Sequence, residues 1–446
     1  MVERLIVIGG VAAGMSAAAK ARRTQRDLEV VVFERGSFIS YAACGMPYFL
    51  AGDITDHREL IVRTPEQMIA QGVDVRIRHE VTAIDAEART VTVRDHERGC
   101  EQQFDYDKLV IATGARAECP PLQGCGLDGV FGLRSLESGL AVHRFLAENK
   151  PKTAVIVGGG YIGIEMAETF RRLGIDVTML IRSGTALRTT IDEDMRKVVH
   201  AELERHDVKL VKDTPVSFDG EGEVEAVVTE GNRYPCEIVM VGVGAAPNVE
   251  LARAAGVHVG ATGAITTDAS MRTNLPDVFA AGDCAEALHL VTGKPAYVPL
   301  GSTANKQGRV AGENAAGGNA VFGGIVGTIV VRCFDLAVAA TGLTADCARG
   351  LGFEVQGTTI QAKDISHYFP GAEDIHVRLV LDADSGMLLG GQIAGKRGVA
   401  KRVDVLATAL HNHMTIAELG KLDLSYAPPF APVWDPILVA ANVASK

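Results

Sequence analysis

The cysteine at position 44 is the residue of this chain that most directly suggests chemistry. It lies in the stretch SYAACGMPY at positions 40–48, and the next cysteine along the chain is Cys100. An enzyme that works through a local pair of cysteines would carry its second thiol within a few residues. A lone reactive cysteine must instead pair with a sulfur atom outside the chain or cycle through an oxidised state of its own sulfur. The pattern predicts an enzyme that handles small thiols, disulfides, persulfides or peroxides.

One strand–turn–helix–strand pattern occurs twice and must position this cysteine. The first copy has an apolar strand at 5–8, the turn GGVAAG at 9–14, a helix to about 23 and a strand at 30–33. The second has a strand at 154–157, the turn GGGYIG at 158–163, a helix to about 173 and a strand at 177–181. Glycines in such turns let backbone amides and a helix N-terminus approach a pyrophosphate. The repeat therefore predicts two dinucleotide-binding units.

The two turns differ in how fully they match the dinucleotide fingerprint. Gly158, Gly160 and Gly163 match G-x-G-x-x-G in full, whereas Val11 replaces the middle glycine of the first turn. Glu34 ends the strand that follows the first turn, about 20 positions on, where an acidic residue binds ribose hydroxyls. A tight turn without any ligand is the alternative for the first copy alone, and two copies at domain spacing argue against it.

Two further buried strands end in small residues that belong with these units. The strand at 108–111 runs into Ala112, Thr113 and Gly114, and the strand at 278–280 leads to Gly282 and Asp283. We expect Asp283 to begin the next helix. Its carboxylate is suited to accept hydrogen bonds from sugar-like hydroxyls, to cap that helix, or to do both.

The pattern changes after about residue 325. Strand-like stretches at 327–332, 338–342 and 377–382 alternate with turns, a helix is expected at 399–413, and no glycine fingerprint occurs. This part is typical of an α+β interface module. The predicted fold is therefore α/β, with two Rossmann-like dinucleotide-binding domains and a C-terminal α+β dimerisation domain. We place the first nucleotide domain at 1–117 and 244–324, the second at 118–243 and the dimerisation domain at 325–446.

The composition restricts the classes of partner. The chain has 446 residues, 47% of them hydrophobic, and a net charge of −11, which argues against nucleic acid or an anionic membrane as the main partner. No apolar run is long enough to span a bilayer, and the N-terminus lacks a signal-peptide pattern. We expect a cytoplasmic protein whose eight cysteines are mostly buried and unreactive, because they show no zinc-type spacing.

Together these motifs resemble those of the FAD-dependent pyridine nucleotide-disulfide oxidoreductases, and most of all the coenzyme A-disulfide reductase group with its persulfide and polysulfide reductase relatives. The resemblance covers nearly the whole chain, including NKQGR at 305–309, YFPG at 368–371 and YAPPF at 426–430. It implies that FAD binds the first unit, that NAD(P)H binds the second, and that the last domain forms a homodimer. The residues implied for the cofactors are Gly9, Gly14, Glu34, Arg35, Ala112, Thr113, Gly114, Gly282 and Asp283 for FAD, and Gly158, Gly160, Tyr161, Gly163, Glu165 and Arg182 for NAD(P)H.

The resemblance also implies a reaction in which the flavin, reduced by NAD(P)H, reduces a mixed disulfide between Cys44 and the substrate thiol. It places Tyr368 and Tyr426 of the other subunit near Cys44, where a phenol can donate a proton to the leaving thiolate. The residues themselves add one expectation. Ser40 is placed to cap a helix that starts just before Cys44, and a thiolate at a helix N-terminus should have a lowered pKa.

Coenzyme A is the substrate thiol that the resemblance implies. Positions that contact it in this group are held here by Ser16, Lys20, Arg23, Ser40 and Asn305. Without the resemblance, the run of cations from Lys20 to Arg26 is a solvated helix end. Ala43 replaces the asparagine that several members carry before the cysteine, which leaves the identity of the thiol open.

Arg182 stands where NADH-preferring enzymes carry an acidic residue. An arginine there can pair with a 2′-phosphate, which favours NADPH, and a solvent-exposed arginine without a ligand is the alternative.

Two other functions compete with this interpretation. An NAD(P)H oxidase or peroxidase would use Cys44 as a sulfenic acid, although Ala12 and Ala13 stand where such enzymes carry a histidine. A flavin-binding redox sensor would need Cys44 for assembly or partner binding. His411 and His413 do not share a helix face, so no metal site is predicted.

Overall fold

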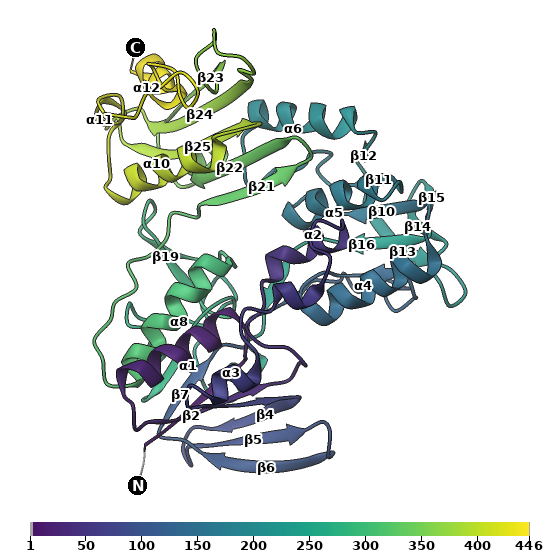
Figure 1. Ribbon diagram of the computed structural model, residues 1–446, viewed down its shortest axis with the longest axis vertical. Helices are drawn as coiled ribbons and strands as arrows, with labels where there is room; N and C mark the ends of the chain where they lie inside the picture. Colours follow the sequence, from purple (N-terminus) through teal and green to yellow (C-terminus); the bar gives the residue numbers. More distant parts are fainter. Residues whose placement is uncertain (1–2, 446) are drawn as a thin grey trace.

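The chain folds around three sheets that lie in separate parts of the molecule (Figure 1). This computed structural model describes residues 3–445. Two sheets are parallel and flanked by helices, and the third is antiparallel, so the predicted fold class is confirmed. The chain crosses between the two parallel sheets through a two-stranded ribbon of β8 (Ala115–Ala117) and β17 (Ala245–Pro247).

The first parallel sheet lies in the lower body in Figure 1. Its strands are, in spatial order, β18 (Val278–Ala280), β7 (Lys108–Ile111), β1 (Arg4–Ile8), β2 (Glu29–Glu34) and β3 (Val73–Ile77). One face packs on α1 (Ala12–Thr24) and α8 (Gly301–Ala315), and the other on β4 (His79–Asp85), β5 (Thr90–Asp95) and β6 (Cys100–Asp105). Alternate residues of β1 enter the two cores, as the two-residue period of a strand requires.

Small residues bring α1 and α8 into close contact. A Cβ on Gly308 or on Gly312 would overlap the carbonyl oxygen of Ala13 or Ala17, respectively. The alanine-rich sequence of α1 therefore serves helix packing beside the first glycine turn.

The second parallel sheet repeats this arrangement. Its strands are, in spatial order, β12 (Lys209–Val211), β11 (Asp176–Leu180), β10 (Thr153–Val157), β16 (Ile238–Val241) and β9 (Val130–Phe131). Three helices and a three-stranded sheet cover its two faces. They are α4 (Leu136–Asn149), α5 (Tyr161–Arg172) and α6 (Glu193–Arg205), and β13 (Pro215–Asp219), β14 (Ala226–Thr229) and β15 (Arg233–Pro235).

The C-terminal domain is an antiparallel five-stranded sheet covered by helices. Its strands are, in spatial order, β21 (Ile329–Cys333), β22 (Leu336–Gly342), β25 (Leu388–Gly395), β24 (Asp374–Asp382) and β23 (Val355–Lys363). The expected strands and helix have bounds within three residues of those of β21, β22, β24 and α10, whereas β23 and β25 were not anticipated. The helices are α9 (Ala345–Gly350), α10 (Val399–His411), α11 (Ile416–Leu419) and α12 (Pro436–Ala444).

Among the described residues, no helix combines the length and apolar character needed to cross a membrane.

Short elements join these bodies. The short elements are η1 (Ala43–Gly45), α2 (Met46–Leu50), η2 (His57–Leu60), α3 (Pro65–Ile69), α7 (Glu250–Ala254), β19 (Ala287–His289) and β20 (Lys294–Ala296).

Candidate functional site

The turn after β1 leaves no room for side chains beside its backbone. Gly9 has a φ of +105°, and a Cβ on it would overlap the carbonyl oxygen of Ala112. A Cβ on Gly14 would overlap the carbonyl oxygen of Gly9. The first turn of α1 therefore lies directly against the end of the strand, where its free amide groups can face a pyrophosphate.

Backbone amides on both sides hold the carboxylate of Glu34. Gly10 donates to one oxygen at 2.6 Å and Gly36 to the other at 2.7 Å. Burial raises the pKa of Glu34, and these two hydrogen bonds act in the opposite direction. The carboxylate lies at the end of β2 beside the first turn, where it can also accept from ribose hydroxyls. Arg35 is the next residue and is exposed.

The end of β7 is locked to the ribbon between the parallel sheets. The hydroxyl of Thr113 donates to the carbonyl oxygen of Asn248 at 2.6 Å, and the Asn248 amide donates to the Thr113 carbonyl oxygen at 2.8 Å. Gly114 follows with a φ of +65°. The predicted residues 112–114 therefore lie at the carboxyl edge of the first sheet.

Asp283 lies in a turn, so the expectation that it begins a helix is wrong. Its side chain is 16% exposed and accepts from the guanidinium of Arg134. The amide of Gly282 donates to the Gln307 side chain at 2.9 Å, which fixes the turn. The phenol of Tyr297, buried near Asp283, has no hydrogen-bond partner among the described residues. Arg134 carries no sequence signal, because Asp283 is 149 positions away.

Cys44 lies in η1, directly before α2. The expectation that Ser40 caps this segment is wrong, because Ser40 has a φ of +48° and neither η1 nor α2 has a side-chain cap. The expected lowering of the thiol pKa is not found either. Burial and the charge of Glu165 raise the pKa of Cys44, against a smaller opposing effect of Arg134. The described residues therefore favour the protonated thiol of Cys44 over its thiolate.

The eight cysteines are less buried than expected. Only three are buried, at positions 236, 284 and 333, whereas Cys44, Cys119 and Cys347 are exposed. Within residues 3–445, the only two cysteine sulfurs in contact are those of Cys119 and Cys125. Cys44 therefore has no partner in its own chain with which to form a disulfide.

A buried carboxyl group faces the region of Cys44 from the second unit. Burial and the charge of Glu168 raise the pKa of Glu165 to about 7, while Arg332 and a hydrogen bond with Tyr48 oppose this. Glu165 therefore changes its charge near neutral pH. The small cavity that it enters is lined by Pro47, Tyr48, Glu165, Glu168, Thr169 and Arg332.

Arg332 on β21 reaches from the C-terminal domain to both nucleotide-binding units. It bonds the carboxylates of Asp53 at 2.9 Å and Glu168 at 2.5 Å, and its guanidinium lies 4.7 Å from the ring centre of Tyr48. Arg172 on α5 bonds Asp53 as well, at 2.5 Å. These contacts hold α2, which follows Cys44, against α5.

The second glycine turn has the geometry of the first. Gly158 has a φ of +110°, and a Cβ on Gly163 would lie 2.5 Å from the Gly158 carbonyl oxygen. Gly160 is the N-cap residue of α5. Tyr161 begins that helix, and its phenol bonds the hydroxyl of Thr190 at 3.0 Å. This turn fits a second pyrophosphate.

Arg182 lies in the turn that follows β11 and is exposed, as is Arg188. Between them, the hydroxyl of Ser183 donates to the carbonyl oxygen of Thr185 at 3.1 Å. Both arginines lie within the described residues, and no carboxylate pairs with either of them there. The edge of the second sheet thus presents two free cations where a bound nucleotide places its adenosine ribose.

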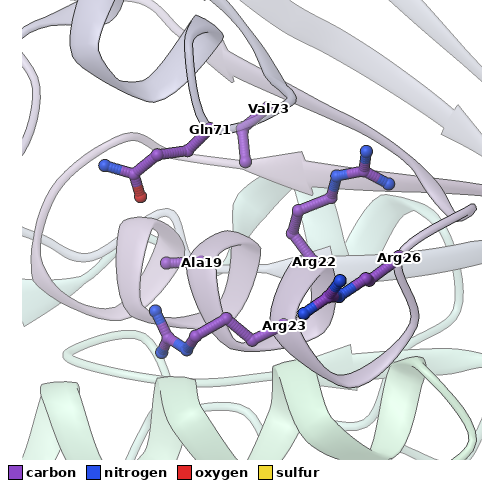
Figure 2. Close-up of a pocket in the computed structure, with 6 residues that line it drawn as sticks. All are labelled: Ala19, Arg22, Arg23, Arg26, Gln71 and Val73. Carbon is purple, nitrogen blue, oxygen red and sulfur yellow. The ribbon is translucent and has the colours of Figure 1, made fainter.

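A basic cavity of about 350 Å³ lies at the end of α1 (Figure 2). Arg22 and Arg23 on α1 and Arg26 just after it line this cavity, together with Gln71 before β3 and Val73 at the start of β3. No acidic side chain lines it. Three positive charges therefore gather in one hollow of a chain whose net charge is −11.

The other side of α1 faces α8. The hydroxyl of Ser16 donates to the side chain of Asn305 at 2.7 Å, so these two predicted substrate residues lie together. Lys20 pairs with Glu313 at 2.8 Å. The Lys20 ammonium group thus has a carboxylate partner within the chain.

Tyr368 and Tyr426 lie together on the C-terminal domain. Their phenol oxygens are 3.3 Å apart, and their exposed fractions are 64% and 47%. The hydrogen bond between them lowers the pKa of Tyr368 and raises the pKa of Tyr426. Phe430 and Trp434 follow Tyr426 in the same segment and are also exposed. Four aromatic side chains are thus available at this surface.

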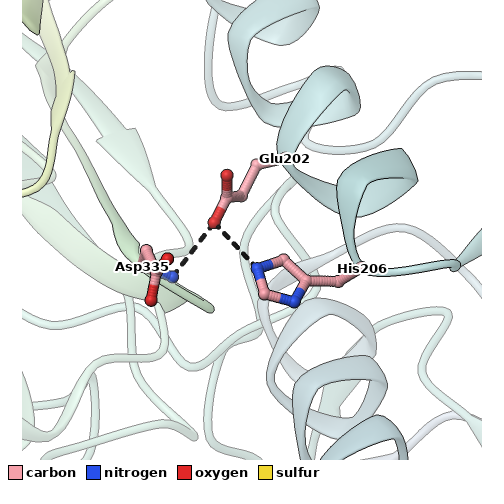
Figure 3. Close-up of side chains that lie close together, drawn as sticks. All are labelled: Glu202, His206 and Asp335. Carbon is pink, nitrogen blue, oxygen red and sulfur yellow. Dashed lines mark hydrogen bonds and ion pairs between the residues drawn. The ribbon is translucent and has the colours of Figure 1, made fainter.

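A cluster of Glu202, His206 and Asp335 joins α6 to the turn between β21 and β22 (Figure 3). Arg205 bonds Glu202 at 2.8 Å and Asp335 at 2.7 Å. Burial raises the pKa of Glu202, but hydrogen bonds from Arg205 and the Asp335 amide outweigh it, so the pKa is lowered. Arg205 bonds both carboxylates, so the cluster forms an ion-pair network that joins the two domains.

Comparison with protein families matches the chain over most of its length. Residues 3–308 match the model of the pyridine nucleotide-disulphide oxidoreductases, and residues 329–436 match the dimerisation domain of the same proteins. An NAD(P)H coenzyme A polysulfide/persulfide reductase of Pyrococcus horikoshii is 39% identical over 99% of this chain and 98% of its own. A coenzyme A disulfide reductase of Staphylococcus haemolyticus is 31% identical over 96% of both chains.

Solved structures agree in shape over nearly the whole chain. The NAD-dependent persulfide reductase of A. fulgidus superposes with a TM-score of 0.96 and is 37% identical, over 99% of this chain and 83% of its own. The water-forming NADH oxidase of Lactobacillus brevis and an engineered NADPH-bound mutant of it each give a TM-score of 0.95 at 29% identity, over 99% of this chain and 98% of theirs.

Proposed function

The chain belongs to the pyridine nucleotide-disulphide oxidoreductase family, and from that premise we propose that it uses NADPH to reduce coenzyme A disulfide, or a related small disulfide, persulfide or polysulfide. The observation that carries the proposal is the isolation of Cys44. Its thiol is exposed, lies within the electrostatic reach of Asp283 in the first unit and Glu165 in the second, and contacts no other cysteine of residues 3–445. A thiol in this position can exchange only with a sulfur from outside the chain.

In the proposed reaction, the Cys44 thiolate attacks one sulfur of a disulfide RSSR. A mixed disulfide between Cys44 and SR forms, and RS⁻ leaves and takes up a proton. Two electrons from NADPH then cleave the mixed disulfide and regenerate the Cys44 thiolate. Over one cycle, NADPH, a proton and RSSR give NADP⁺ and two RSH. FAD, when bound, supplies the two-electron carrier between nicotinamide and sulfur.

The residues of the first unit fit FAD. The amides of the first turn face the position of a pyrophosphate, and the fixed carboxylate of Glu34 can accept from a ribose hydroxyl. Asp283 and the unpaired phenol of Tyr297 provide an acceptor and a hydrogen-bonding hydroxyl at the other end of the site. Arg134 pairs with Asp283 and so fixes the position of that carboxylate.

The preference for NADPH rests on Arg182, Ser183 and Arg188. The NADPH-bound oxidase is an engineered mutant of an NADH oxidase. In the mutant, alanine replaces an aspartate, and arginine and serine replace the next two residues. A second arginine is introduced six positions after the first. Arg182, Ser183 and Arg188 have the same order and spacing, and Ile181 precedes them. Replacing Arg182 and Arg188 by alanine should raise the KM for NADPH and leave the KM for NADH nearly unchanged.

Coenzyme A is the preferred thiol because of the basic cavity. Its phosphates carry negative charge, and Arg22, Arg23 and Arg26 offer three guanidinium groups without a competing carboxylate in the lining. Ser16 and Asn305 lie where α1 faces α8, and they offer polar groups for the chain that joins the phosphates to the thiol. A cytoplasmic location fits a protein with free, exposed thiols.

A homodimer completes the proposed site. The dimerisation-domain match covers Tyr368 and Tyr426, which lie exposed beside Phe430 and Trp434. Burial of these aromatic side chains against a second copy would stabilise an interface. Either phenol could then donate a proton to the thiolate that leaves the partner's Cys44 region.

The test uses the FAD-loaded enzyme with Cys44→Ser, and Cys347→Ser as a matched control for an exposed cysteine outside the site. We expect Cys44→Ser to retain FAD and lose NADPH-dependent reduction of coenzyme A disulfide, while Cys347→Ser keeps both. Denaturing mass spectrometry of untreated enzyme should find coenzyme A on the Cys44 peptide. Full activity of Cys44→Ser would refute the proposal.

An NAD(P)H oxidase is the second candidate, favoured by the likeness to the NADH oxidases. It predicts rapid NADPH oxidation in air without any disulfide, and one added oxygen on Cys44 in place of a coenzyme A adduct.

A further inference from the structure

The loop that leaves the inter-sheet ribbon contains the only two cysteine sulfurs in contact among residues 3–445. Cys119 comes two positions after β8, and Cys125 follows six positions later, with their sulfurs 2.7 Å apart. This is well inside the distance at which two unbonded sulfur atoms normally touch. The reaction proposed above uses neither thiol.

We propose that Cys119 and Cys125 form a second redox site, a reversible disulfide that closes the loop between the ribbon and the second nucleotide-binding unit when small disulfides are abundant. The proposal rests on the proposed function only for the class of oxidant. The pairing itself follows from how the loop is built.

The backbone of the loop holds the two thiols together. Two prolines follow Cys119, and the chain then turns back, with the amide of Leu122 bonded to the Pro120 carbonyl oxygen and the amide of Cys125 bonded to that of Leu122. A proline fixes its φ angle, so this segment has few alternative conformations. The thiol of Cys125 also donates to the Pro120 carbonyl oxygen at 3.0 Å.

The loop is anchored to different bodies at its two ends. On the Cys119 side, the amide of Glu118 bonds the carbonyl oxygen of Gly244, next to β17 of the ribbon. On the Cys125 side, Gly124 has a φ of +85°, and a Cβ there would overlap the carbonyl oxygen of Phe218 on β13. A bond between the two sulfurs would therefore join the ribbon to the second unit.

The two cysteines differ in access. Cys119 is exposed, whereas Cys125 is partly buried and packs with Leu122 and Leu127 on the core beside β13–β15. Burial and the neighbouring sulfur raise the pKa of Cys119 to about 12. Because the thiolate is the attacking species, the pair should react slowly at neutral pH and faster as the pH rises.

The reaction balances with a small disulfide as the oxidant. The thiolate of one cysteine attacks RSSR, which forms a mixed disulfide and releases one RSH after protonation. The second cysteine attacks the protein sulfur of that mixed disulfide, loses its proton and releases the other RSH. Two protein thiols and RSSR thus give the Cys119–Cys125 disulfide and two RSH, and excess RSH reverses the reaction.

The test uses full-length, FAD-loaded enzyme treated with cystamine or with coenzyme A disulfide, followed by alkylation and trypsin digestion. Both cysteines lie on one tryptic peptide, residues 117–134, because no lysine or arginine separates them. We expect this peptide to become lighter by two hydrogen atoms and to take up no alkylating agent. The same change should occur in Cys44→Ser and in Cys347→Ser, since neither cysteine belongs to the pair.

Cys119→Ser and Cys125→Ser should lose this product, and each should instead carry a mixed disulfide on its remaining thiol or stay reduced. Amide hydrogen exchange over 118–126 should slow on oxidation of the wild type and not of Cys125→Ser. Two alkylated thiols, or a stable mixed disulfide, on the wild-type peptide after both oxidants would overturn the proposal. The proposed function is tested separately, by NADPH oxidation with coenzyme A disulfide. It fails if NADPH is not oxidised.

Discussion

Ionisation of Glu165 should alter both the stability of the fold and the reactivity of Cys44 with pH, and the substitution Glu165→Gln tests this. The folded-state pKa of Glu165 is raised from 4.5 to about 7, chiefly by burial. The folded protein therefore holds a proton that the unfolded chain releases. Its contribution to stability is fully present below about pH 4.5 and is lost as the pH rises through about 7. At about 1.36 kcal/mol per pKa unit, ionised Glu165 costs the fold up to about 3 kcal/mol.

Glu165→Gln keeps the shape of the side chain and cannot ionise. The difference in unfolding free energy between variant and wild type should be near zero at about pH 4 and should favour the variant by up to about 3 kcal/mol at about pH 8.5. Because the charge of Glu165 opposes the Cys44 thiolate, alkylation of reduced Cys44 should also titrate at lower pH in the variant. Chemical denaturation and peptide-specific alkylation of the FAD-loaded enzyme measure the two effects.

Glu168→Gln is the matched control on the same helix. Its carboxylate bonds Arg332 and the amide of Phe334, so its loss should destabilise the protein at both pH values. Removing this charge also lowers the pKa of Glu165 and should not ease ionisation of Cys44. A Glu165→Gln effect that is the same at both pH values, with an unchanged Cys44 titration, would refute the reasoning.

Three further outcomes follow from the structure. Gly14→Ala should abolish FAD retention, measured as flavin absorbance per protein, because the new Cβ overlaps the Gly9 carbonyl oxygen, whereas Gly231→Ala, where a Cβ meets nothing, should retain it. Arg332→Met should lower the unfolding free energy by about 3 kcal/mol, since the buried Glu168 carboxylate keeps only the amide of Phe334 and the more distant Arg172, at 3.7 Å, as partners. Arg349→Met, which breaks the exposed pair with Asp346, should lower the unfolding free energy by less than about 1 kcal/mol. Equal losses of unfolding free energy in the two arginine variants would contradict this account. Tyr426→Phe should lower kcat for disulfide reduction by about a hundredfold with little change in thermal stability, and an unchanged kcat would exclude a proton-donating role.

The parallel parts of the fold were predictable because their signals are local. The turns at 9–14 and 158–163 lie between apolar strands and helices, and the glycines mark positions where a Cβ has no space. In the C-terminal domain, β25 was missed because its sequence LLGGQIAG is buried throughout and lacks alternation. β23 alternates only weakly, and two of its nine residues are apolar β-branched side chains.

The part of the site that the sequence did not reveal consists of long-range ion pairs. Arg134 is identified only through Asp283, and Arg332 only through Asp53 and Glu168. Each pair joins segments more than a hundred positions apart, so neither spacing nor periodicity records it. Ser40 was wrongly predicted to cap a helix. Serine favours helix caps, but Ser40 has a left-handed backbone conformation here.

The raised pKa of Cys44 bears on the proposal that a second subunit completes the site. A disulfide reductase requires a thiolate, yet burial and Glu165 disfavour it here, and Arg134 already pairs with Asp283. Stabilisation must then come from groups that arrive with the bound cofactor, the substrate or a second subunit. Two phenols that share a hydrogen bond at an exposed aromatic surface are suited to this, because one can donate to a thiolate while the other keeps it oriented. We therefore expect the Cys44 thiol to react faster in the assembled, loaded enzyme than in the free chain.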